Sequence, residues 1–248
     1  MDHFELLMED AEHPFYGWNF EYIADRLVMA PSNWSFSTEI IPRLRNVNSM
    51  LDMGTGGGEY LSSLQPLPRN THATEAYEPN IRLAKEKLEK IGVTVHGIVE
   101  YDPLPFQSNY FDLVMNRHEW YNEKEVYRIL REEGEFVTQQ VGPTNNHELN
   151  DFLGGISDPE TTNWKFEEKV EQLKNVGFTV AKTDQAWPLT RIFDIGAIVY
   201  YLKAIPWQIQ DFSVDKYRDK LHQLHLKILE KGYIDVTSHH CLIIAKKE

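Results

Sequence analysis

The sequence predicts an α/β fold built on one mostly parallel sheet of seven strands. Strand-like and helix-like segments alternate from about residue 48 to the end of the chain, which is typical of such sheets. The strand-like segments are short, apolar and rich in β-branched residues. The 248 residues, 42% of them hydrophobic, are enough for a large core, and no linker or internal repeat divides them. We therefore expect a single domain, residues 1–248.

Seven segments have the composition of buried strands. They are residues 49–53, 71–77, 93–99, 111–115, 135–138, 178–182 and 240–245. Three helices are predicted by apolar residues at helical spacing, and these span residues 79–91, 122–130 and 213–231. The second of them begins with a capping-box pattern, and the third ends at a glycine.

Two regions lie outside this alternation. Residues 1–47 are helical in pattern and unusually aromatic, and residues 188–235 insert mostly helical sequence before the last strand. We expect both to form a cap over the carboxyl edge of the sheet, where α/β proteins bind ligands. The core would then span residues 48–187, and the last strand would lie in residues 236–248.

Charge and cysteine content exclude several classes of protein. With 25 basic and 38 acidic residues, the formal charge of −13 argues against broad binding of a nucleic-acid backbone. Cys241 is the only cysteine, so a disulfide framework cannot form, and we expect no metal site. The N-terminus lacks a signal-peptide pattern, and the longest apolar run, residues 195–202, is too short to cross a membrane. We expect a soluble, cytoplasmic protein without a membrane partner.

The most informative stretch is a glycine turn that follows the first strand. It reads Asp52-Met53-Gly54-Thr55-Gly56-Gly57-Gly58-Glu59, a Gly-x-Gly-x-Gly spacing. Glycine in such a turn admits positive φ and lets a ligand approach the backbone. A dinucleotide-binding turn would have a third glycine where Glu59 stands, and that carboxylate would repel a pyrophosphate. The pattern therefore disfavours a nucleotide-dependent oxidoreductase.

This turn resembles the first motif of the Rossmann-like S-adenosylmethionine-dependent methyltransferases. The resemblance implies that Asp52, Gly54, Thr55, Gly56 and Gly58 hold the methionine end of S-adenosylmethionine, and that S-adenosylhomocysteine is the product. It also implies an acid at the end of the second strand that accepts both ribose hydroxyls. Glu75, 23 positions after Asp52, supplies that acid, and Ala76 follows it. Glu78 is the alternative, although it stands where a helix begins.

A third match is residues 99–106 followed by Phe111-Asp112-Leu113-Val114, which resembles the family's adenine-binding segment. By this resemblance Glu100 or the backbone of Tyr101 contacts the adenine amino group, with Asp102 as an alternative to Glu100. The helix and turn at 125–134 also resemble the family, but Glu132-Glu133-Gly134 replaces the usual Pro-Gly-Gly. The resemblance implies a Rossmann-like sheet with an antiparallel last strand and helices on both faces.

The loop after the fourth strand, Asn116-Arg117-His118-Glu119-Trp120, carries the candidate chemistry. In the resembled family this loop faces the methyl group, so we expect Asn116 to contact the methionyl end through its backbone. His118 and Glu119 are the candidate catalytic acid/base pair. The alternative is that the loop is only solvated, or that His118 packs against the cap. We expect most of the aromatic residues of the cap to pack between helices. Trp34 is the exception, as a candidate residue in the wall of the cofactor or substrate site.

The residue types narrow the acceptor. Methylation at cytosine C5 needs a nucleophilic cysteine, and the only one lies in the last strand. The Pro-Pro-aromatic motif of adenine or glutamine amino methylation is absent after Asn116, and an amide there replaces the acid of metal-dependent catechol methylation. What remains is metal-independent transfer to a small molecule. An RNA-modifying methyltransferase and a non-catalytic S-adenosylmethionine-binding protein are the alternatives.

Overall fold

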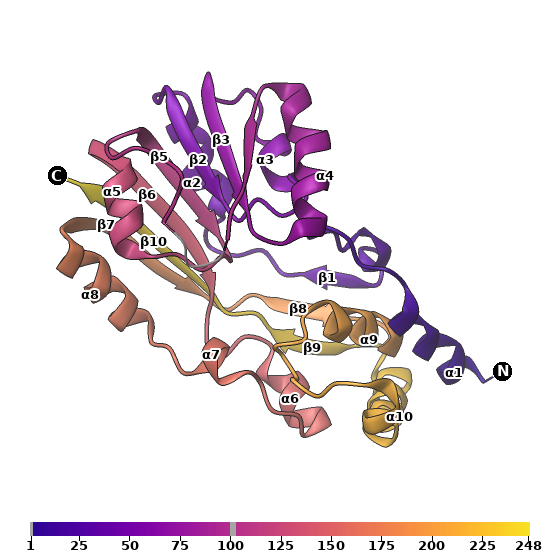
Figure 1. Cartoon of the computed structure of the whole chain (residues 1–248). Helices are drawn as coiled ribbons and strands as arrows, with labels where there is room; N and C mark the ends of the chain where they lie inside the picture. The colour runs from indigo at the N-terminus through magenta and orange to yellow at the C-terminus, as the bar shows by residue number, and fades with distance from the viewer. Residues whose placement is uncertain (1, 100–102) are drawn as a thin grey trace.

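A seven-stranded sheet forms the centre of the larger of two units in the molecule (Figure 1). The computed structural model describes residues 2–99 and 103–248. The strands are β2 (Ser49–Met53), β3 (Asn70–Glu75), β4 (Thr94–Gly97), β5 (Phe111–Arg117), β6 (Leu130–Val141), β7 (Phe178–Ala186) and β10 (His240–Lys247). Their order is β4-β3-β2-β5-β6-β10-β7, and β10 runs antiparallel to both of its neighbours. The predicted α/β fold with an antiparallel last strand is confirmed.

Helices cover both faces of this sheet because its central strands are apolar on both sides. One face carries α2 (Phe36–Leu44), α3 (Glu59–Ser63) and α4 (Glu78–Leu88), and the other carries α5 (Glu123–Ile129) and α8 (Phe166–Val176). The alternation is clear in β10, where Leu242 and Ile244 join the first hydrophobic cluster and Cys241 and Ile243 join the second.

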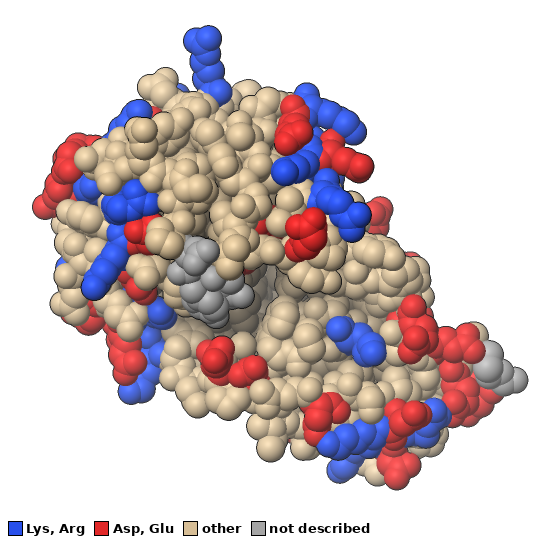
Figure 2. Space-filling view, viewed as in Figure 1, with Lys and Arg blue, Asp and Glu red and all other residues tan. Residues whose placement is uncertain are grey.

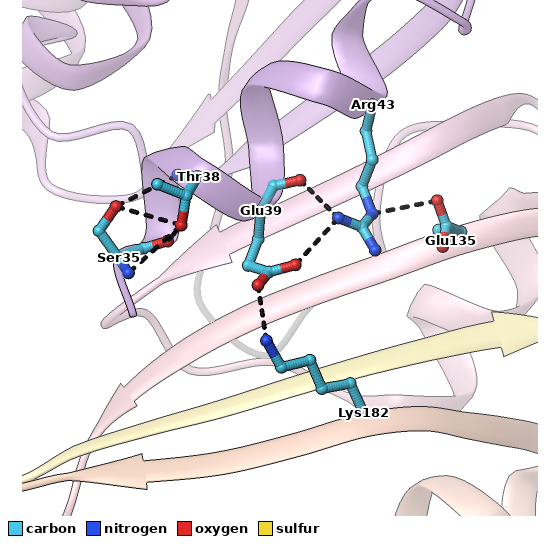
Figure 3. Close-up of polar contacts among 6 residues, drawn as sticks. All are labelled: Ser35, Thr38, Glu39, Arg43, Glu135 and Lys182. Atoms are coloured by element: carbon cyan, nitrogen blue, oxygen red, sulfur yellow. Dashed lines mark hydrogen bonds and ion pairs between the residues drawn. The ribbon is translucent and has the colours of Figure 1, made fainter. Parts of the chain in front are cut away.

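Helix α2 is fixed to the far strands of the sheet by charged side chains (Figure 3). Ser35 begins the helix with a capping box. The ammonium group of Lys182 on β7 donates to Glu39 at 2.7 Å. Arg43 donates to Glu39 at 3.2 Å and to Glu135 on β6 at 3.1 Å. The N-terminal segment is thereby tied to the core before it enters β2.

A second unit, which we call the cap, packs at the carboxyl edge of the main sheet (Figure 1). It contains a three-stranded antiparallel sheet of β1 (Leu27–Met29), β8 (Leu189–Ile192) and β9 (Ile234–Thr237), in the order β1-β8-β9. Its helices are α1 (His3–Met8), α6 (His147–Leu153), α9 (Ile195–Ala204) and α10 (Val214–Lys231), with the short α7 (Pro159–Thr162) nearby. These elements share one hydrophobic cluster that includes Phe4, Leu149, Ile198, Leu224 and Val236.

The cap differs from the predicted one in two ways. It is not only helical, because β7 continues into β8 through residues 187–188 and β9 continues into β10 through residues 238–239. It also recruits α6, which lies within the segment 48–187 that we assigned to the core. The cap is therefore assembled from three separate stretches of the chain.

Candidate functional site

A cavity of about 1480 Å³ lies between the carboxyl edge of the main sheet and the cap. Figure 2 shows the corresponding hollow between the core and the cap. The core contributes the loops after β2, β3, β5 and β6, and the cap contributes Phe15 and Trp18, Asn145 and Ser157, and Trp207 and Gln208. Clefts of this kind bind small molecules and cofactors.

The glycine turn and Glu75 form one hydrogen-bonded unit in this cavity. Gly54 and Gly56 adopt φ of 67° and 61°, which a residue with a side chain rarely does. The Gly56 N–H donates to Glu75 Oε2 at 2.7 Å, and the N–H groups of Ala76 and Tyr77 donate to Oε1 at 3.0 and 2.9 Å. Burial raises the pKa of Glu75, and these three N–H groups oppose that rise.

The structure separates Glu75 from its alternative. Glu75 is buried and lines the cavity, whereas Glu78 is exposed at the start of α4 and does not. Gly58 and Ala76 do not line the cavity: Gly58 caps α3 with φ of 82°, and Ala76 contributes its backbone to Glu75. The predicted adenine contacts, Glu100 or Tyr101 with Asp102 as alternative, lie outside the described residues.

Asp52 is a buried carboxylate beside the turn. Its pKa is raised to about 7, chiefly by burial and to a smaller extent by the nearby Glu75, while Thr55 and the guanidinium of Arg117 oppose the rise. Arg117 lies over the ring of Tyr60 at 4.5 Å, and both residues line the cavity. The cavity thus combines a carboxylate that titrates near neutrality with a guanidinium group.

The predicted catalytic loop is held against the glycine turn and β6. A Cβ atom added to Gly54 would lie 2.4 Å from Glu119 Cβ, so the glycine permits this contact. Asn116 does not line the cavity, because its buried amide oxygen accepts from Thr138 at 2.9 Å and from Gln140 at 2.6 Å. Asn116 therefore links β5 to β6.

His118 lines the cavity in a neutral form. Its backbone has φ of 66°, and its N–H donates to the Gln139 carbonyl at 2.8 Å. The Gln139 amide nitrogen donates to His118 Nε2 at 3.0 Å, which leaves the ring proton on Nδ1. Burial, followed by the charge of Arg117, lowers its pKa to about 3. Such an imidazole donates a hydrogen bond from Nδ1 but accepts a proton poorly.

The aromatic residues of the N-terminal segment divide between packing and the cavity. Trp34 is buried in the hydrophobic cluster under α2 and does not line the cavity. Phe15, Tyr16 and Trp18 do line it, and Trp18 stacks on Trp207 with ring centroids 6.0 Å apart and an interplanar angle of 8°. The aromatic density of this segment is visible in the sequence, but the sequence does not indicate which ring faces the cavity.

Several residues that line the cavity come from distant segments and were not predicted from the sequence. Trp207 and Gln208 follow α9, and Asn145 and Ser157 flank α6. Tyr121 could have been identified from the sequence, because it stands two residues after Glu119 in the predicted catalytic loop. The others are brought to the site only by the assembly of the cap.

The described part of the chain contains no group of three or more His, Cys, Asp or Glu side chains placed to hold a metal ion. Within the same residues, no helix combines the length and apolar character needed to cross a membrane.

Comparison with known proteins identifies the class of the core. Residues 51–138 match a family model described as a methyltransferase domain. The candidate methyltransferase BH2331 of Bacillus halodurans C-125 shares the fold with a TM-score of 0.59 at 17% identity, over 86% of this chain and 99% of its own.

Two further solved structures share the fold. YcgJ of Bacillus subtilis aligns with a TM-score of 0.57 at 16% identity, over 86% and 97% of the two chains. The cyclase SpnF aligns with a TM-score of 0.54 at 15% identity, over 98% and 91%. A search of curated proteins by sequence gives no match. The match over residues 51–138 shows that this chain contains a methyltransferase domain, and the solved structures share the fold that surrounds it.

Proposed function

We propose that this protein transfers the methyl group of S-adenosylmethionine to a small-molecule acceptor by in-line displacement, without a metal ion. The observation that supports this most is the bond between the Gly56 N–H and Glu75, because it joins the glycine turn to the ribose-binding acid inside one cavity. The cavity is large enough for a cofactor and a second molecule together.

The residues of the turn fit the cofactor. Asp52, Gly54, Thr55 and Gly56 line the cavity and would hold the methionine end, and Glu75 would accept from a ribose hydroxyl. Each carboxylate oxygen can accept two hydrogen bonds, and Glu75 Oε2 accepts one from the chain, so it can take another. Gly58, Ala76 and Asn116 would act through backbone geometry. The adenine contacts at Glu100 or Tyr101 stay a proposal from the family resemblance.

The protein's task in this reaction is mainly alignment. When bound, the cofactor supplies an electrophilic methyl group on a sulfonium. Holding the acceptor in line with that group can contribute about 7–11 kcal/mol. We propose Glu119 and His118 as the catalytic pair. Because the accepting nitrogen of His118 is occupied by Gln139, the carboxylate of Glu119 would take any proton released, and His118 would orient the acceptor from Nδ1.

Calorimetric titration tests the cofactor assignment. We expect S-adenosylmethionine to bind and NAD not to bind. The Glu75→Ala variant should weaken S-adenosylmethionine binding by about 1–3 kcal/mol, the range for losing charge-assisted hydrogen bonds. Glu78→Ala is the matched control, because it removes an exposed carboxylate three residues away and should leave the affinity unchanged. Binding of NAD alone would contradict the proposal.

A non-methylating function is the second candidate, and one observation favours it. The cyclase SpnF shares this fold over 98% of the chain, so the fold alone does not determine the reaction. Transfer of a radiolabelled methyl group to a metabolite extract separates the two, since a protein that only binds the cofactor gives no labelled product. Transfer to total RNA, offered in place of the metabolite extract, would support the RNA-modifying alternative.

A further inference from the structure

The floor of the cavity has two chemically different parts. The lining residues Trp18, Trp120 and Trp207 are exposed, between 37% and 46%, and therefore mark its mouth. Buried lining residues mark its floor. One part of that floor, at β2 and β3, is polar and includes Asp52 and Glu75. The other part lies at β10 and α8.

We call this second part the β10 compartment and define it by Tyr121, Trp164, Phe166, Cys241 and Ile243. Tyr121, Phe166, Cys241 and Ile243 are each less than 10% exposed. In the sheet order, β5 and β6 stand between β2 and β10, so the compartment lies beside the predicted cofactor site along the same edge. Its position and its apolar walls suit a second ligand rather than the cofactor.

One polar atom in this compartment is unsatisfied. The hydroxyl of Tyr121 is buried, and the described residues offer it no hydrogen-bond partner. Phe136 packs edge-on against its ring with centroids 4.9 Å apart. Burial raises the pKa of this phenol, so the hydroxyl keeps its proton and remains a donor. A buried donor without a partner destabilises the protein, so a ligand atom that accepts from it is favoured.

The other polar groups nearby are already satisfied or neutral. Lys169, which also lines the cavity, is paired with Glu123 at 3.3 Å. The thiol of Cys241 lies 3.5 Å from His239 Nε2, and burial raises its pKa to about 12, so it is a neutral part of the wall. A ligand in this compartment therefore meets apolar surface, the paired ammonium group of Lys169, which lies 5.8 Å from the centroid of the Tyr121 ring, and Tyr121 itself, whose hydroxyl has no partner among the described residues.

We propose that the β10 compartment binds the methyl acceptor as a largely apolar molecule with a hydrogen-bond-accepting oxygen, and that Tyr121 Oη donates to this oxygen. The identification of the ligand as the acceptor rests on the proposed function. Tyr121 is then a specificity-determining residue, because a purely hydrocarbon molecule would leave its hydroxyl unpaired.

Two variants and two probes test this proposal. The probes are 2-acetylnaphthalene and 2-ethylnaphthalene, which share an apolar body and differ by a carbonyl oxygen in place of two hydrogens. Their affinities are measured by ligand-observed NMR. Tyr121→Phe removes only the hydroxyl. The control is Tyr201→Phe, since Tyr201 lies outside the cavity and its hydroxyl accepts from Asn146 at 3.0 Å.

The wild-type protein should prefer the ketone, and Tyr121→Phe should reduce that preference about fivefold, the effect of one hydrogen bond. The melting temperature of Tyr121→Phe should be unchanged or raised, because an unpaired buried hydroxyl is removed. Tyr201→Phe should lower the melting temperature and leave the preference intact.

An unchanged preference in Tyr121→Phe, a fall in its melting temperature like that of Tyr201→Phe, or no binding of either probe to the wild-type protein would each overturn the proposal. S-adenosylmethionine affinity, measured on the same samples, reports on the proposed function separately. If the cofactor binds and Tyr121 has no effect, only the acceptor assignment fails.

Discussion

Cofactor affinity should rise with pH, because the carboxylate that would hold the cofactor's ammonium group is half protonated at neutrality. Burial raises the pKa of Asp52 to about 7 in the absence of ligand. Its proposed role requires the ionised form, so binding must release the proton wherever the free protein carries it. Glu75, whose pKa is also raised, changes the affinity in the same direction.

The size of the effect follows from the titration. With a pKa of about 7, roughly one-tenth of Asp52 is ionised at pH 6 and roughly nine-tenths at pH 8. If only the ionised form binds, the apparent affinity increases about tenfold over this interval, which corresponds to about 1.4 kcal/mol. At pH 7 binding should release about half a proton from this group.

Calorimetry with S-adenosylhomocysteine measures both quantities, because the affinity gives the pH profile and buffers of different ionisation enthalpy give the protons released. Asp52→Asn, which keeps the shape and cannot titrate, should bind more weakly and lose most of the pH dependence. A wild-type profile that is flat from pH 6 to pH 8 would refute the reasoning, since Asp52 would then be ionised throughout or away from the ligand.

The same residue should lower the stability of the ligand-free protein. The folded state holds the proton of Asp52 more tightly than the unfolded chain does, so the protonated carboxyl group stabilises the fold relative to the ionised one. This stabilisation is complete below about pH 4 and is lost as the pH rises through about 7. The difference from the ordinary value of 3.8 corresponds to at most about 4 kcal/mol. Asp52→Asn should therefore melt at a higher temperature than the wild-type protein at pH 8.

Three further outcomes are expected. His118→Gln should leave the pH dependence of turnover unchanged between pH 5 and 8, because a pKa of about 3 keeps the imidazole neutral there. If turnover of the wild-type protein fell at acidic pH and that of the variant did not, His118 would titrate in this range and the prediction would be wrong. Gly54→Ala should lower the melting temperature more than Gly92→Ala, since both have positive φ but only Gly54 faces a side chain, that of Glu119. Glu39→Gln should lower the free energy of unfolding by about 1 kcal/mol, measured with denaturant at pH 7. Because ion pairing lowers the pKa of Glu39, this difference should shrink as the pH falls below 4; a constant difference would argue against the pairs.

The main sheet could be predicted because its signals are local. The strand at 49–53 agrees with β2 residue for residue, since an apolar run ends there at glycines. The small sheet of the cap could not be predicted. Val28 and Met29 of β1 are more than half exposed, so the strand has no apolar alternation, and it pairs with β8 more than 160 residues further along the chain.

The candidate site shows the same division. Glu75 was predicted from the family resemblance together with its spacing to Asp52, and the structure places both residues in one cavity. The neutral state of His118 depends on burial and on the charge of Arg117, and its tautomer depends on Gln139, a contact that no motif encodes. Trp34 and Trp18 have the same side chain in the same segment, and only tertiary packing decides which one reaches the cavity.

The three-segment construction of the cap has a consequence for how the protein folds. Its contacts join residues far apart in sequence, such as Leu27 with Ile192 on β1 and β8, and Glu5 with Arg218 on α1 and α10. Contacts of such high sequence separation form slowly because a long loop must close first. The parallel strands β2 to β6 need only local crossovers. During synthesis, strands β2 to β6 can therefore pair before β10, which carries the cavity residues Cys241 and Ile243, has left the ribosome.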